Sequence, residues 1–192
     1  MRWRWPGADR GWAGARVADT GKIFGSGPLV NKAVLREEIL QQLKQELARQ
    51  TTAAVMARDE AISEESRAES KWDTHSQEAA YLAEGQAKLA GEIRASIELY
   101  SALPLPGFGP SDPVAIGAVV ELESGPAGRL RRARYLLGPR AGGLAVVVDG
   151  GEVLVLTPQS PLGREVLGRR AGEVWVGGGR GLGATQRIIA VY

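Results

Sequence analysis

Hydrophobic residues recur at helical spacing in two long runs between residues 33 and 101. This spacing places side chains on one face of a helix, and neither run contains a proline, which costs about 3 kcal/mol in a helix interior. We therefore predict two long helices. The stripe of the first is formed by Leu35, Ile39, Leu43, Leu47, Ala54, Ala57 and Ala61, and that of the second by Leu82, Gln86, Leu89, Ile93, Ile97 and Tyr100.

Each stripe is too narrow to be buried by itself, so we expect the two helices to cover each other as an antiparallel α-helical hairpin, or coiled coil, over residues 31–102. The bend then falls near residues 67–70, and each leg is on the order of 50 Å long at about 1.5 Å per residue. The predicted pairs are Leu35 with Leu99 or Tyr100, Leu43 with Ile93, and Leu47 with Leu89.

The pattern changes at residues 103–114, where four prolines in ten residues cannot continue a helix and predict a short, semi-rigid linker. Beyond the linker the residues follow a strand pattern, with turn signals between the runs. We predict strands over residues 118–122, 130–137, 144–148, 152–156, 172–176 and 186–192. The chain is therefore expected to be α+β, with a small, strongly curved antiparallel β-sheet domain after the hairpin.

Local signals refine the C-terminal prediction. Asp149-Gly150 is typical of a two-residue hairpin turn. Ser160 suits the N-cap of a helix, Pro161 its first position and Gly168 its end, which predicts one short helix of about two turns. The glycine-rich stretch 177–183 is followed by a strand pattern and not by a helix, so we interpret it as a hairpin loop and not as a phosphate-binding loop.

Composition excludes several kinds of site. The 192-residue chain has no cysteine, which excludes disulfides and cysteine zinc sites, and its one histidine argues against a His-rich metal site or a Ser-His-Asp arrangement. No apolar run approaches the roughly 18 residues that a membrane helix needs, so we expect a cytoplasmic protein with no membrane partner. Because the hairpin covers its own stripe, we expect a monomer.

Charge is distributed unevenly along the chain. Residues 1–30 carry five basic and two acidic side chains, residues 31–103 carry nine and thirteen, and residues 104–192 carry ten and seven. The net charge of +2 therefore combines an acidic hairpin with two mildly basic flanks. Without a dense basic run, this distribution is weak evidence for nucleic-acid binding.

Residues 1–30 show neither a helical nor a strand period, and they lack the continuous apolar core of a secretory signal. We expect this leader to be disordered, or to be translated upstream sequence if Val30 is encoded by GTG and initiates the protein. A functional basic arm is the alternative. N-terminal mass spectrometry of the native protein distinguishes these interpretations.

The bend of the hairpin is acidic over residues 64–73. Its carboxylates are Glu64, Glu65, Glu69 and Asp73. Like charges held close together repel unless a cation or a positive partner neutralises them, and Mg²⁺ is a cation that takes oxygen ligands. Two interpretations follow: a solvated turn, which costs little, and a probe that delivers carboxylates to a metal ion.

Three segments bear on the choice: Leu156–Arg169, Gly172-Glu173-Val174-Trp175-Val176 and Arg187–Tyr192. The first is similar to the Ser-Pro-x-x-x-x-Leu/Ile-x-Gly-Lys/Arg segment in the C-terminal domain of the bacterial Gre family (GreA and GreB) of transcript-cleavage factors. The second resembles the strand that follows it in that family, and the third the family's last strand. The resemblance covers roughly residues 31–192.

The resemblance implies that residues 115–192 are an FKBP-like domain that docks on the rim of the secondary channel of RNA polymerase, while the hairpin enters the channel. Tip carboxylates would help the polymerase hold Mg²⁺ and position a water, so that backtracked RNA is cut at its nascent 3′ end. The protein would then be an accessory factor of transcription elongation that binds no cofactor alone and is not itself an enzyme.

Gre factors carry an Asp and a Glu three residues apart at the tip, and the nearest counterpart here is Glu69-Ser70-Lys71-Trp72-Asp73, preceded by Glu65. Glu65 and Glu69 share one face if the helix persists there. We expect Glu65 and Glu69 to be the catalytic pair that shares the polymerase's Mg²⁺, with Asp73 next. Two alternatives stay open: a non-cleaving modulator or inhibitor of the polymerase, and a structural coiled coil with no polymerase partner.

Overall fold

The computed structural model describes residues 30–65, 75–109, 111–125, 130–177 and 185–192. These residues fall into two compact units, Ala33–Pro104 and a second unit that includes Leu105–Tyr192. The predicted leader, apart from Val30, lies outside the described residues. Each unit has buried apolar side chains of its own.

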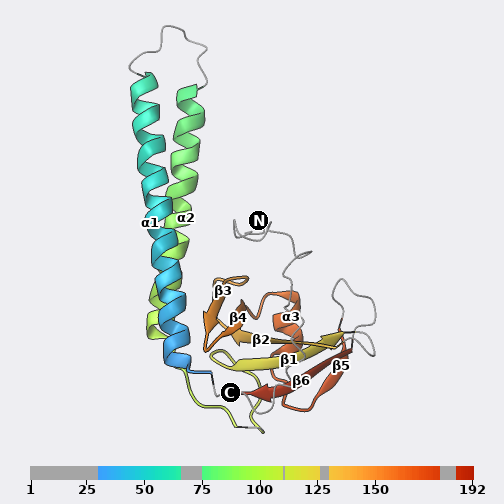
Figure 1. The fold of residues 1–192 in the computed structure, drawn as a ribbon. Coiled ribbons are helices and arrows are strands. Elements are labelled where there is room, and N and C mark those ends of the chain that lie inside the picture. Colours follow the sequence, from blue (N-terminus) through green and yellow to red (C-terminus); the bar gives the residue numbers. More distant parts are fainter. Residues whose placement is uncertain (1–29, 66–74, 110, 126–129, 178–184) are drawn as a thin grey trace. The chain divides into compact units, whose positions relative to one another are not determined.

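The first unit is a pair of long antiparallel helices (Figure 1). Helix α1 spans Lys32–Glu65 and helix α2 spans His75–Ala102, so that α1 is about 50 Å long at 1.5 Å per residue. Helix α2 ends just before the proline-rich stretch that begins at Pro104, since proline lacks the N–H that a helix interior requires. The predicted hairpin is therefore confirmed.

The half of the hairpin near Ala33 and Ala102, which we call the basal half, buries most of the predicted stripe and half-buries the rest. The buried members are Leu35, Ile39, Leu43, Ile93 and Tyr100, and the half-buried ones are Leu47, Leu89 and Ile97. Of the two candidate partners of Leu35, Tyr100 is buried whereas Leu99 is 43% exposed. The antiparallel register that pairs Leu35 with Tyr100 also pairs other buried residues of the two helices, to within one residue. One register therefore explains which side chains of the basal half are buried. The matching pairs are Leu43 with Ile93 and Glu46 with Ala90.

The half of the hairpin near Glu65 and His75, which we call the distal half, departs from the predicted stripe. Leu82, which we expected to point inward, is 53% exposed, so that prediction is wrong. The inward positions of α1 are taken by small side chains instead: Ala57 is buried and Ala54 is half-buried. These small side chains bring little apolar surface between the helices, so the distal half buries less apolar surface than the basal half.

The second unit contains a six-stranded sheet in the order β3-β4-β2-β1-β6-β5. Every predicted strand is present, with ends shifted by up to three residues. The strands are β1 Val119–Gly125, β2 Arg131–Leu137, β3 Ala145–Val148, β4 Gly151–Leu156, β5 Val174–Val176 and β6 Thr185–Val191.

The sheet is mostly antiparallel, but β2 and β4 run parallel, with Leu136 beside Val155. The predicted antiparallel sheet is therefore confirmed apart from this one pair of strands. The reason for the parallel pair is the position of β3, which follows β2 in the chain but takes the outer edge of the sheet and pairs only with β4. The returning strand of the β3–β4 hairpin therefore lies next to β2 in the same direction.

The turn and helix-cap signals in the C-terminal part are confirmed, whereas residues 178–183 of the glycine-rich stretch lie outside the described residues. Asp149 and Gly150 join β3 to β4 with φ angles of 52° and 73°, and positive φ at both central residues is typical of a type I′ hairpin turn. Helix α3 spans Pro161–Val166, and the Oγ of its N-cap residue Ser160 accepts a hydrogen bond from Gly163 N–H at 3.0 Å. This bond satisfies one of the backbone donors that the first turn leaves free.

One cluster of buried apolar side chains in the second unit joins the sheet to α3. It joins residues from β1, β2, β4, α3 and β6, together with Val114 before the sheet. The buried members are Val114, Ala118, Val120, Leu122, Leu137, Leu156, Val166, Ile188 and Val191. In the described part of the chain, no helix has the length and apolar character needed to cross a membrane.

Candidate functional site

The predicted site residues fall in the sequence between the end of one helix and the start of the next, and we call the end of the hairpin at Glu65 and His75 its free end. Glu65 is the last residue of α1 and His75 is the first of α2, and the two helix ends lie side by side (Figure 1). Glu69 and Asp73 lie outside the described residues, as does the side chain of Glu65. The acidic segment 64–73 thus connects the legs at the end farthest from Ala33. Among the side chains that the structure describes, no group of three or more His, Asp or Glu could hold a metal ion.

Halfway along the hairpin, polar side chains replace the apolar stripe. Glu46 has a side chain only 10% exposed, and its carboxylate accepts hydrogen bonds from Arg49 Nε at 2.9 Å and from Gln50 Nε2 at 2.6 Å. Burial alone would raise the pKa of Glu46, but the bonds from Gln50 and Arg49 and the Arg49 charge outweigh it, so the pKa lies below its usual range. Gln86 Oε1 is buried without a hydrogen-bond partner among the described residues.

Beyond this polar layer, the distal half exposes large apolar side chains. Val55 and Met56 of α1 are 53% and 67% exposed, and Tyr81 and Leu82 of α2 are 74% and 53% exposed. The register that joins Leu43 with Ile93 places Val55 level with Tyr81, about 18 Å nearer the free end at 1.5 Å per residue.

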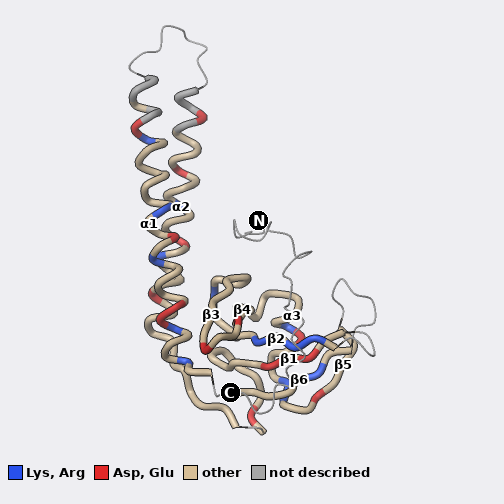
Figure 2. The backbone as a smooth tube through the Cα atoms, viewed as in Figure 1, with Lys and Arg blue, Asp and Glu red and all other residues tan. Residues whose placement is uncertain are grey.

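Sequence reasoning missed this exposed group because Leu82 fits the helical period of the stripe. A second signal was present: neither residues 50–57 nor residues 79–83 contain a charged side chain (Figure 2). Charged residues are normally frequent on the solvent side of such a hairpin. The absence of charged residues from both helices at the same level is therefore a better indicator of this exposed apolar surface than the helical period is.

The three segments that resemble Gre factors meet in the second unit. Arg169, in the first segment, stacks its guanidinium on the ring of Trp175 in the second, 4.3 Å from the ring centroid. Arg169 also donates to Glu173 at 3.2 Å, and Trp175 Nε1 donates to Glu165 at 2.9 Å. The second segment contains β5, which pairs with β6 in the third. Contacts of α3 with the closing strands thus hold these segments together.

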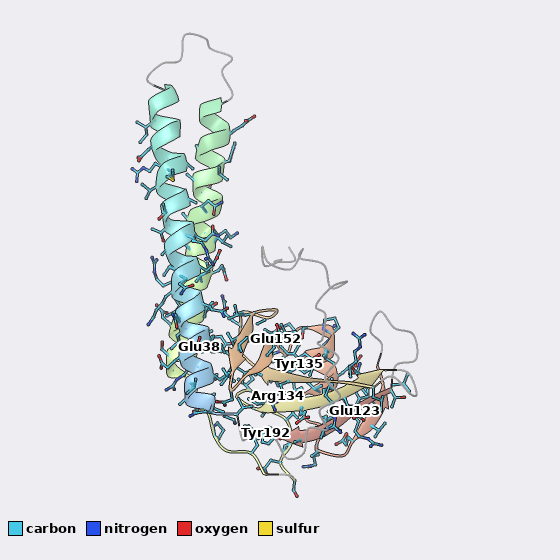
Figure 3. All side chains as sticks on the ribbon, viewed as in Figure 1. Glu38, Glu123, Arg134, Tyr135, Glu152 and Tyr192 are labelled. Atoms are coloured by element: carbon cyan, nitrogen blue, oxygen red, sulfur yellow. The ribbon has the colours of Figure 1, made fainter. Side chains whose placement is uncertain are left out.

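A group of polar side chains also lies on β1, β2 and the chain end after β6 (Figure 3). Arg132 forms ion pairs with Glu121 at 3.8 Å and with Glu123 at 3.1 Å. Burial raises the pKa of Tyr192, and the Glu121 carboxylate raises it further, while Arg134 opposes the shift. Because these groups partly neutralise one another, we interpret them as cross-strand stabilisation and not as a binding site.

The chain matches no protein-family model and no curated protein sequence. Solved structures that the chain is similar to include the following three. The GreA factor homolog 1 (Gfh1) protein of Thermus thermophilus is 22% identical, with a TM-score of 0.32 over 80% of this chain and 94% of that one. A structure of the transcription factor Gfh1 is 21% identical, with a TM-score of 0.32 over 82% and 92%. Thermus aquaticus Gfh1 is 21% identical, with a TM-score of 0.32 over 85% and 96%.

Proposed function

We propose that this protein binds bacterial RNA polymerase, inserts its hairpin into the secondary channel and promotes cleavage of backtracked RNA through acidic residues at the free end. The observation that carries the proposal is the hairpin itself, a unit of its own whose legs end at Glu65 and His75. Two helices about 40 to 50 Å long would reach into an opening that is too narrow for a sheet domain. The acidic segment is carried at the end of this probe.

Glu65 and Glu69 are the proposed pair at the free end, with Asp73 next to them. Carboxylate oxygens suit Mg²⁺, which usually keeps waters and substrate phosphates as the rest of its ligand shell. One or two carboxylates would complete the shell of an ion that the polymerase already holds. When bound, that Mg²⁺ would supply Lewis-acid catalysis and activate a water. The protein would be an accessory to the polymerase's own cleavage of nascent RNA, with no cofactor bound alone.

The second unit supports the same proposal through its local contacts. The Arg169–Trp175 stack and the Trp175–Glu165 hydrogen bond join the segments that resemble the Gre C-terminal domain. In this proposal the second unit docks on the rim of the channel and the hairpin acts inside it. The protein would work as a cytoplasmic monomer, since one copy supplies both parts.

A cleavage assay on backtracked polymerase complexes tests the proposal. The wild-type protein is expected to shorten the RNA, and a Glu65→Ala, Glu69→Ala double variant is expected to lose this activity while binding the polymerase normally. Glu84→Ala is a matched control, because Glu84 is an exposed carboxylate on α2 below the acidic segment. Normal cleavage by the double variant would show that the tip residues are assigned wrongly.

The sequence of the tip favours a second candidate, a non-cleaving modulator of the same channel. Glu69-Ser70-Lys71-Trp72-Asp73 departs from the acidic spacing of Gre factors and places a cation between the carboxylates. Such a protein would bind the polymerase equally well, slow elongation by occupying the channel, and leave backtracked RNA uncut. A pull-down that recovers no polymerase would contradict both candidates and leave a structural coiled coil.

A further inference from the structure

We propose that residues 50–57 of α1 and 80–83 of α2 form an uncharged belt around the hairpin, and that this belt contacts apolar and uncharged side chains lining a channel in the partner protein. The inference rests on the proposed insertion into RNA polymerase and names one part of the contact surface. Charged residues border the belt on both legs. They are Arg49 and Arg58 on α1, and Glu78 and Glu84 on α2.

The belt reverses the usual distribution of side chains in a helical hairpin. A hairpin in water places its large apolar residues between the legs and its polar residues outside. Here Ala57 is buried, whereas Met56 and Tyr81 are 67% and 74% exposed. Large apolar side chains outside small ones add nothing to the hairpin's own core, but they are well placed for a surface that covers the hairpin from outside.

The size of the exposed group argues against a second copy of this chain as the occupant. Val55, Met56, Tyr81 and Leu82 together expose an area on the order of a few hundred Å², the range of surface patches that serve interactions. A stable interface needs roughly 800 Å² from each partner. The belt is therefore sized to be one part of a larger interface and not the whole of a dimer contact.

The position and chemistry of the belt favour the wall of a protein channel as the surface that the belt contacts. The belt lies between the free end and the basal half, so a hairpin that enters an opening with its free end first carries the belt into the same opening. Nucleic acid is a poor occupant, because RNA and DNA are bound chiefly through Lys and Arg contacts to phosphate, and residues 50–57 and 80–83 contain neither.

Binding to bacterial core RNA polymerase tests the belt with two matched pairs of substitutions. Met56→Gln with Tyr81→Gln removes apolar surface from the belt, and we expect about tenfold weaker binding. Val34→Gln with Leu99→Gln is the control, since these two residues are each 43% exposed on the basal half. We expect the control pair to bind like wild type, and circular dichroism to show native helix content in both.

The outcomes separate this inference from the proposed function. If wild type binds the polymerase and the belt pair binds equally well, the belt is overturned and the proposed function stands. An equal loss in the control pair also overturns it, because the effect would not be specific to the belt. If wild type does not bind the polymerase, the proposed function fails. If sedimentation shows dimers of the wild type and the belt pair abolishes them, a second copy of this chain covers the belt. The proposed contact with the wall of a channel would then be wrong.

Discussion

The carbonyl oxygen of Thr157 lies 1.9 Å from the point where a Cβ on Gly163 would stand. Ser160, between them in the chain, links the same two residues: its Oγ donates to Thr157 O at 2.8 Å and accepts from Gly163 N–H at 3.0 Å. The first turn of α3 therefore closes directly onto the chain that leaves β4. Only glycine fits at this approach.

Gly163→Ala is expected to destabilise the sheet unit by about 3 kcal/mol or more, because the added methyl meets backbone that cannot move without breaking the cap. Hydrogen exchange of the backbone amides in β1 and β4, measured at increasing urea concentration, gives the change in the free energy of unfolding of the sheet unit. Gly91→Ala is the control, since Gly91 lies in α2 with nothing within 4 Å of its added Cβ. We expect that change to stabilise the hairpin by about 0.5–1 kcal/mol. Equal effects of the two would contradict the close approach.

Trp175→Phe keeps an aromatic ring under the Arg169 guanidinium but removes the Nε1–H that donates to Glu165 at 2.9 Å. The bond goes to a carboxylate and is partly buried, so we expect the sheet unit to lose about 1.5–2 kcal/mol of unfolding free energy. Thermal unfolding of the two proteins side by side gives the difference. Combining the change with Glu165→Gln should cost little more than either alone if the two side chains act through this one bond.

Stability at alkaline pH should depend on Lys32. Its Nζ donates to Pro106 O at 2.6 Å and lies 4.6 Å from the centroid of the Phe108 ring, and burial lowers its pKa from 10.5 to about 8. Below pH 8 both states carry the charge, and burial of that charge costs stability. Between about pH 8 and 10.5 only the unfolded chain holds the proton, so the free energy of unfolding rises with pH.

Lys32→Met removes this titration, and the difference in stability between variant and wild type should therefore shrink as pH rises through that interval. Because Lys32 keeps contact with solvent, we expect a change of about 1 kcal/mol. The ¹³Cε chemical shift of Lys32 in the folded protein reports its pKa directly. A titration midpoint near 10.5 would contradict the burial of this amine.

Acid should weaken the hairpin through Glu46, whose pKa lies below its usual 4.5 in the folded state. The stabilisation is present above that usual value and is lost as pH falls through the lowered pKa, since the protonated carboxyl no longer pairs with Arg49. Glu46→Gln should cost about 1 kcal/mol at neutral pH and nothing in strong acid. Helical circular dichroism during thermal unfolding measures it, with the exposed Glu98→Gln as the charge-matched control. A constant difference across the pH range would rule out this role of Glu46.

Much of the fold could be predicted from local patterns. The helical period of Leu35, Leu43, Ile93 and Tyr100 indicated the hairpin, because two apolar stripes that no other element covers are buried only if the two helices pack against each other. Asp149-Gly150 and the Ser160 cap were predictable because backbone preference at these positions depends on the residues themselves. The candidate site itself stays a prediction from the charge of residues 64–73, most of which lie outside the described residues.

Other features depended on contacts between distant residues. Leu82 fits the helical period but is 53% exposed, since the period within one helix does not specify how the partner helix packs against it. The parallel pairing of β2 with β4 follows from β3 taking the edge of the sheet, which no pattern within β3 specifies.

The sequence by itself determined which segments are helix, strand and turn, because spacing, prolines, caps and turn residues act within a few residues of chain. It also predicted an acidic segment, residues 64–73, between the two helices. Only the tertiary structure decided that Arg169 stacks on Trp175, that Thr157 requires glycine at position 163, and that Met56 and Tyr81 face outward. Those outcomes depend on the space that remains once all the elements have packed, and such space is a property of the assembled fold.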